Sequence, residues 1–125
     1  MTPATSYIRA QRARARTLAE SIAVLADRDV LVAPASAIVA PKIGTTQMLE
    51  AREDRVAVVA AILRFTQPFN STGQPAIAIP TGLSPDGLPI AMQVIGRPFG
   101  EPEVIRVAAA YESARGALPA APEIA

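Results

Sequence analysis

The sequence predicts an α/β fold in which helices cover a mixed sheet. Short apolar runs closed by prolines alternate with longer amphipathic segments, in the order helix, strand, helix, two strands, helix. The predicted strands are apolar on both faces, which is typical of a sheet covered on both sides. Three strands leave at least one sheet edge unpaired, so the architecture looks incomplete. With no internal repeat, we expect residues 1–125 to form one partial domain with its core at about 7–114.

The first predicted helix spans Tyr7 to Ala26. Its apolar residues recur at steps of three, four or seven: Ile8, Ala15, Leu18, Ile22 and Leu25. The first nineteen residues contain four arginines and no acidic residue, a composition shared with targeting peptides and RNA-binding arms. We favour a solvated helix, because the arginines fall outside the apolar stripe.

A strand over residues 30–33 and a second helix over 46–64 are predicted next. The strand run is short, apolar and closed by Pro34, as expected for a strand buried on both faces. Residues 35–45 lack periodicity and predict a loop, after which Thr45 or Thr46 can cap the helix. The apolar stripe of that helix consists of Val56, Val59, Ala60 and Leu63.

The second half of the chain predicts a β-hairpin followed by a helix. Residues 65–75 contain several turn formers and predict a bridge, which leads to a strand over 76–79. The segment 84–87 has the proline and glycine spacing of a type I turn, and a strand over 88–95 follows it. The last helix opens at Glu101 and can close at Gly116, leaving 117–125 as a tail. Its buried stripe is Val104, Val107, Ala108 and Tyr111.

Composition excludes several kinds of chemistry. Twelve basic and eleven acidic residues give a net charge of +1, which provides no argument for nucleic acid or a membrane surface as partner. Cysteine and histidine are both absent, so disulfides, thiolate nucleophiles, imidazole bases and the commonest metal ligands are excluded. We expect no cofactor and no metal, and a soluble protein compatible with the reducing cytoplasm.

Lysine is the only remaining base for a serine nucleophile, and the chain has one, Lys42. A pair between Lys42 and Ser36 or Ser71 is conceivable if the lysine is desolvated. We favour a solvated surface lysine, because nothing near it in the sequence indicates burial. The paired acids of the helix starts are explained by the helix dipole.

One stretch has a recognisable pattern. It begins with Thr66-Gln67-Pro68-Phe69-Asn70-Ser71-Thr72-Gly73-Gln74-Pro75 and continues, after Pro80-Thr81-Gly82, with Gly87-Leu88-Pro89-Ile90-Ala91-Met92-Gln93. This stretch resembles the C-terminal conserved region of amidase-signature enzymes, which have a layered α/β/α fold. The residues from Asp29 to Ser36 and from Glu101 to Glu112 resemble the flanking strand and helix of that family.

The resemblance implies a family that cleaves or transfers carboxamide nitrogen through an acyl-enzyme, with two serines and a lysine as catalytic residues. In the family those residues come earlier in the chain, in a Gly/Ser-rich stretch that this sequence lacks. We therefore assign no catalytic residue and expect a C-terminal amidase fragment that is inactive alone. The alternatives are a fragment of the amidotransferase subunit for transfer-RNA amidation and a non-catalytic interaction module.

The matching positions give modest site predictions. Thr66, Asn70 and Gly73 are candidates for the substrate pocket, although a structural role in a turn is favoured for Asn70 and a backbone role for Gly73. Gln93, Gly82 and Gly87 are predicted to be structural, and Gln93 must find hydrogen bonds if it is buried.

The expected partners follow from the unpaired edges and the apolar sheet faces. They are the missing N-terminal amidase segment or further copies of this chain, with a small amide as substrate only in the complete enzyme.

Overall fold

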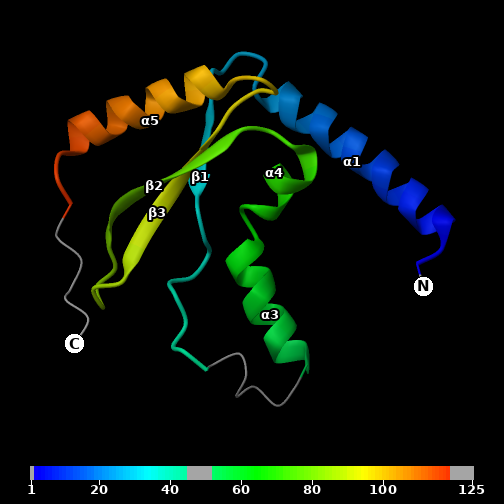
Figure 1. The fold of residues 1–125 in the computed structure, drawn as a ribbon, viewed down its shortest axis with the longest axis horizontal. Helices are drawn as coiled ribbons and strands as arrows, with labels where there is room; N and C mark the ends of the chain where they lie inside the picture. Colours follow the sequence, from blue (N-terminus) through cyan, green and yellow to red (C-terminus); the bar gives the residue numbers. More distant parts are fainter. Residues whose placement is uncertain (1, 45–51, 119–125) are drawn as a thin grey trace.

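The fold is that of a computed structural model, and the structure describes residues 2–44 and 52–118 (Figure 1). Helices and strands alternate along the chain broadly as predicted. The elements are α1 (Ala4–Val24), β1 (Leu31–Pro34), α3 (Arg52–Leu63), α4 (Gln67–Thr72), β2 (Ala76–Leu83), β3 (Pro89–Ile95) and α5 (Glu101–Arg115).

The three strands form one sheet in the order β1-β3-β2. Both pairings are antiparallel, and Val94 of the central strand lies opposite Val32 on one side and Ile77 on the other. The α/β class is confirmed. Within the described residues no strands pair in parallel, so a parallel part of the expected mixed sheet would have to lie elsewhere.

The hairpin between β2 and β3 has the predicted turn. The amide of Gly87 donates to the carbonyl of Ser84 at 2.9 Å, and the Ser84 hydroxyl accepts from the amide of Leu88 at 3.1 Å. Gly87 has φ +77, a conformation that glycine adopts without a Cβ penalty. The strand β2 is longer than predicted, because it continues past Pro80 to Leu83 through a register shift at Pro80/Gly82. Proline is tolerated there because β2 is an edge strand.

The core lies between the hairpin and α5, which crosses one face of β2 and β3 (Figure 1). Ile79 and Val94 from the sheet pack against Val104 and Ala108 from the helix, and all four side chains are at most 5% exposed. The predicted stripe of α5 is confirmed, since its other two members are half-buried against this cluster. The amphipathic period of the last helix therefore identifies the face that packs on the sheet.

The first strand differs from its prediction. It spans Leu31–Pro34 rather than 30–33, and half-buried residues alternate with exposed ones. Val32 is 52% exposed, so the prediction of burial on both faces is wrong for this strand. The reason is that β1 forms the sheet edge opposite β2, while α5 packs on β2 and β3.

Two long helices are confirmed with shifted ends. The first, α1, spans Ala4–Val24 rather than 7–26, and of its predicted stripe only Leu25, just past the helix end, is fully buried. Within the described residues α3 begins at Arg52; the predicted residues 46–51 and the caps Thr45 and Thr46 lie outside the described part. The last seven residues of the predicted tail also lie outside it.

The bridge predicted over residues 65–75 contains a helix, α4 (Gln67–Thr72), and the prediction of an irregular turn is wrong there. Pro68 occupies the first turn, where a missing N–H leaves no hydrogen bond unmade. Gly73 closes the helix at φ +77, with its amide donating to the carbonyl of Phe69 at 2.8 Å. Proline at the start and glycine at the end therefore delimit a short helix here.

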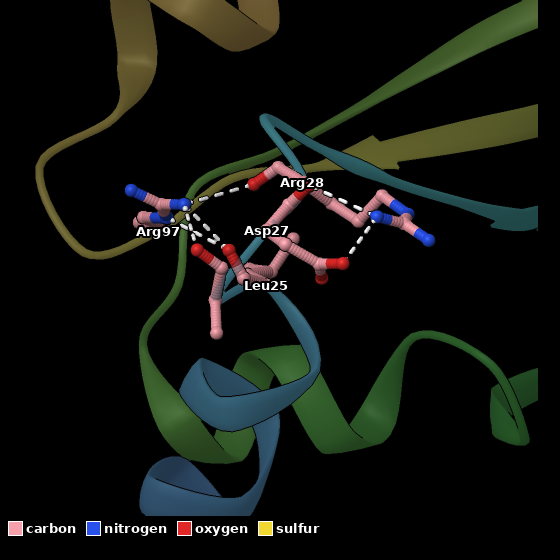
Figure 2. A network of polar contacts seen from close by, with 5 residues as sticks. Leu25, Asp27, Arg28 and Arg97 are labelled. Atoms are coloured by element: carbon pink, nitrogen blue, oxygen red, sulfur yellow. Dashed lines mark hydrogen bonds and ion pairs between the residues drawn. The ribbon is translucent and has the colours of Figure 1, made fainter.

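Arg97 ties the loop after β3 to the end of α1 (Figure 2). Its guanidinium donates to the carbonyls of Leu25, Ala26 and Arg28, with Nε 3.2 Å from the first and Nη2 3.3 and 3.0 Å from the others. These carbonyls belong to the turn after the helix, where backbone acceptors lack intrahelical donors. One side chain thus fixes the direction in which the chain leaves α1 toward β1.

Candidate functional site

A cavity of about 150 Å³ lies between α4 and the face of the sheet that points away from α5. Side chains alternate along a strand, so Ala76, Ala78 and Gln93 face this cavity while Ile79 and Val94 face α5. The complete lining is Thr66, Phe69, Asn70, Ala76, Ile77, Ala78 and Gln93. We call this the α4 pocket.

The α4 pocket brings together two of the three predicted pocket residues. Thr66 and Asn70 lie one helical turn apart, and the amide of Asn70 donates to the carbonyl of Thr66 at 3.1 Å. Asn70 lies in a helix, not in the predicted turn, and its exposed side chain has no hydrogen bond to the described part of the chain. The Thr66 hydroxyl makes a long contact of 3.4 Å to the Leu63 carbonyl. Both polar groups therefore keep hydrogen-bonding capacity for a ligand.

The glycines lie elsewhere. Gly73 does not line the α4 pocket and instead ends α4 in the left-handed conformation described above. Gly82 lies at the register shift of β2, and Gly87 lies in the hairpin turn. All three positions are explained by backbone geometry.

Gln93 forms the floor of the pocket. It is 3% exposed, and its Nε2 donates to the carbonyls of Pro34 at 3.1 Å and Phe65 at 2.6 Å. The side chain therefore links the central strand to the end of β1 and to the segment before α4. An amide in this role holds the pocket wall in place and cannot act as a base.

A second buried polar network, centred on Gln74, was not predicted from the sequence. The Oε1 of Gln74 accepts from the hydroxyls of Ser21 at 2.7 Å and Thr72 at 3.1 Å, and its Nε2 donates to the carbonyl of Gly96 at 3.0 Å. The network joins α1, the end of α4 and the residue that follows β3. The available signal was a glutamine between glycine and proline, which on sequence alone indicates a turn and not a buried residue.

The α4 pocket contains no acid or base. Its lining consists of apolar side chains, one hydroxyl and two carboxamides. Lys42 is exposed, and the Ser36 hydroxyl donates to the carbonyl of Ile38 at 2.7 Å, so among the described residues no Ser-Lys pair forms between these two side chains. A hydrogen bond to Glu20 raises the pKa of Arg16, but neither residue lines the pocket. The lining of the α4 pocket therefore offers hydrogen-bonding groups but no base that could activate a nucleophile.

The described residues offer no grouping of metal ligands. Over residues 2–44 and 52–118, no three acidic, histidine or cysteine side chains are placed so as to hold a metal ion. None of the described helices is long and apolar enough to cross a membrane.

Comparison with known proteins identifies the family. The family model for amidases matches residues 1–105. This chain belongs to the amidase family. The resemblance found in the sequence is therefore confirmed, and it extends through the pocket, the hairpin and the start of α5.

The relatives of this chain have several named activities. The chain is 38% identical over 113 residues to a fatty acid amide hydrolase of Medicago truncatula, covering 90% of this chain and 18% of that enzyme. It is 38% identical over 117 residues to a glutamyl-tRNA(Gln) amidotransferase subunit of Brevibacillus brevis, covering 94% and 23% of the two chains.

Two solved structures superpose on this chain. The glutamyl-tRNA(Gln) amidotransferase subunit of Thermotoga maritima does so with a TM-score of 0.72 and 34% identity, covering 86% of this chain and 22% of that one. A 6-aminohexanoate cyclic dimer hydrolase gives a TM-score of 0.60 and 35% identity, covering 70% and 19%. The chain thus spans about a fifth of the length of these amidases.

Proposed function

We propose that this chain forms one wall of the substrate site of an amide hydrolase, which converts a carboxamide to a carboxylate and ammonia or an amine. The observation that carries the proposal is the α4 pocket, in which Thr66 and Asn70 lie together beside an apolar surface. A carboxamide substrate has one acceptor and one donor group, and the Asn70 amide and the Thr66 hydroxyl can pair with both.

The proposed contribution of this wall is binding, not bond making. An acyl-transfer reaction needs an activated nucleophile, and the described lining contains no base to activate one. The family resemblance implies a serine nucleophile, a second serine and a lysine, none of which matches a residue of this sequence. In this proposal they come from a part of an amidase outside the chain.

A second candidate is supported by the amidotransferase relatives. The identity to the Brevibacillus brevis protein equals the identity to the Medicago truncatula hydrolase, 38% in both cases. In this alternative the same pocket wall would serve an enzyme that releases ammonia from glutamine for transfer. The location we propose for either candidate is the cytoplasm, with which the absence of cysteine is compatible.

A graft tests the proposal. In the Medicago truncatula hydrolase, the 113-residue matched region is replaced by the corresponding residues of this chain, and turnover of a fatty acid amide is measured. We expect the graft to hydrolyse the amide and this chain alone to show no turnover. A folded graft without turnover would contradict the proposal. A matching graft is made in the Brevibacillus brevis protein. The second candidate would be favoured if that graft hydrolysed glutamine while the first graft did not hydrolyse the fatty acid amide.

A further inference from the structure

The helix α3 presents an apolar groove to solvent. Val56, Val59 and Leu63 are 58%, 46% and 39% exposed although they form the predicted apolar stripe of this helix. Together with Ala60 they line a hollow of about 380 Å³, with Arg55 and Gln67 contributing the polar part of its lining. We call this the α3 groove.

The other side of α3 also leaves apolar surface uncovered. Ile62 borders a second hollow of about 500 Å³, formed with the loop of residues 35–41 and the start of β3. In Figure 1, α3 lies apart from the strands, whereas α5 crosses them. Helices shorter than about 12–15 residues are marginal in water without tertiary packing, and α3 spans 12 residues in the described part. Packing against another segment would bury this apolar stripe and stabilise the helix.

The comparisons indicate what that partner is. The chain covers 18% of the Medicago truncatula hydrolase and 22% of the Thermotoga maritima protein, so most of an amidase domain lies beyond its matched region. A net charge of +1 provides no electrostatic basis for choosing a charged partner, whereas the groove lining is mainly apolar. Ala60 in the middle of the groove allows another backbone to approach closely.

We propose that the α3 groove is the docking surface for the part of an amidase domain that this chain does not span. The inference rests on the proposed function, because it assigns the chain to a complete amidase. The occupant is an apolar segment of that part, whether it belongs to the same polypeptide or to a separate one. Docking would stabilise α3, and with it the segment that leads directly into Thr66 and the α4 pocket.

Cysteine footprinting tests the proposal without requiring a stability measurement. The chain has no cysteine, so Ala60→Cys and Ala57→Cys each add one thiol to it. Both alanines are exposed on α3, but only Ala60 lines the groove. Labelling by N-ethylmaleimide is followed by mass spectrometry of the peptide containing the new cysteine, in the isolated chain and in the graft described above.

We expect labelling at position 60 to be about tenfold slower in the graft than in the isolated chain, because the docked state must open first, with a change of less than about twofold at position 57. Equal rates at position 60 in a folded graft would overturn the inference. Protection in the isolated chain that grows with protein concentration would also overturn it, because the occupant would then be a second copy.

This experiment can contradict either proposal without contradicting the other. An active graft with fast labelling at position 60 contradicts the docking surface and leaves the function standing. A protected but inactive graft contradicts the function and leaves the surface standing. As a further check, Val59→Asp places a charge in the groove and should lower the Tm of the graft by roughly 5 °C or more, while Ala57→Asp should not.

Discussion

Replacing Gln93 by methionine removes the hydrogen bonds that hold the pocket floor and keeps the side-chain volume nearly constant. In the native chain Nε2 donates to the carbonyls of Pro34 and Phe65, at 3.1 and 2.6 Å. Methionine has no donor, so both carbonyls lose this partner. Since methionine has nearly the same shape as glutamine, no cavity adds to the loss of unfolding free energy.

The size of the effect follows from the burial of the two bonds. Gln93 itself is 3% exposed, but Pro34 is exposed and Phe65 is half-buried, so water can reach the freed carbonyls in part. At about 1 kcal/mol for each bond, the free energy of unfolding should fall by about 2 kcal/mol. With a slope of roughly 1.5 kcal/mol per molar urea, the unfolding midpoint should fall by roughly 1–1.5 M.

Urea titration followed by far-ultraviolet circular dichroism measures this midpoint. Gln11→Met is the matched control, because Gln11 is an exposed glutamine of α1 whose side chain has no hydrogen bond within the described residues. We expect the control to shift the midpoint by less than about 0.3 M. A shift for Gln93→Met no larger than that of the control would refute the assignment of Gln93 as the link between β1, β3 and the segment before α4.

Three further predictions concern the scaffold and the pocket. Gly96→Ala places a Cβ 2.6 Å from Cγ2 of Val104 and should cost about 1–3 kcal/mol of unfolding free energy by urea titration; a neutral result would contradict the close approach of α5. Arg97→Met should cost about 1 kcal/mol and speed amide exchange at the end of α1, whereas unchanged exchange would mean that the guanidinium bonds do not fix that turn. The α4 pocket lining has no carboxylate, imidazole or amine, so the pH dependence of kcat/KM for the active graft should match that of its host; a new ionisation would contradict the proposed binding role.

The hairpin and α5 were predictable because local chemistry determines them. The turn at Ser84 to Gly87 needs only its proline and glycine, and the stripe from Val104 to Tyr111 repeats with the helical period. In each case the residues that make the structure are neighbours in sequence or lie one turn apart.

The site was less predictable because it depends on contacts between distant segments. Gln93 contacts carbonyls 59 and 28 residues away, and Gln74 joins segments 53 and 22 residues from it. No local pattern identifies such partners. The helix α4 was missed for a different reason, since its proline and glycine are helix boundaries that also occur in turns.

The central claim is that this chain forms a wall of the amide-binding site, and Asn70 tests it most directly. Its side chain is exposed and has no hydrogen bond to the described residues, so Asn70→Ala should leave the Tm of the graft unchanged. If the amide of Asn70 binds substrate, kcat/KM of the graft for a fatty acid amide should fall about tenfold. A value of kcat/KM within about twofold of the unmodified graft would contradict the claim.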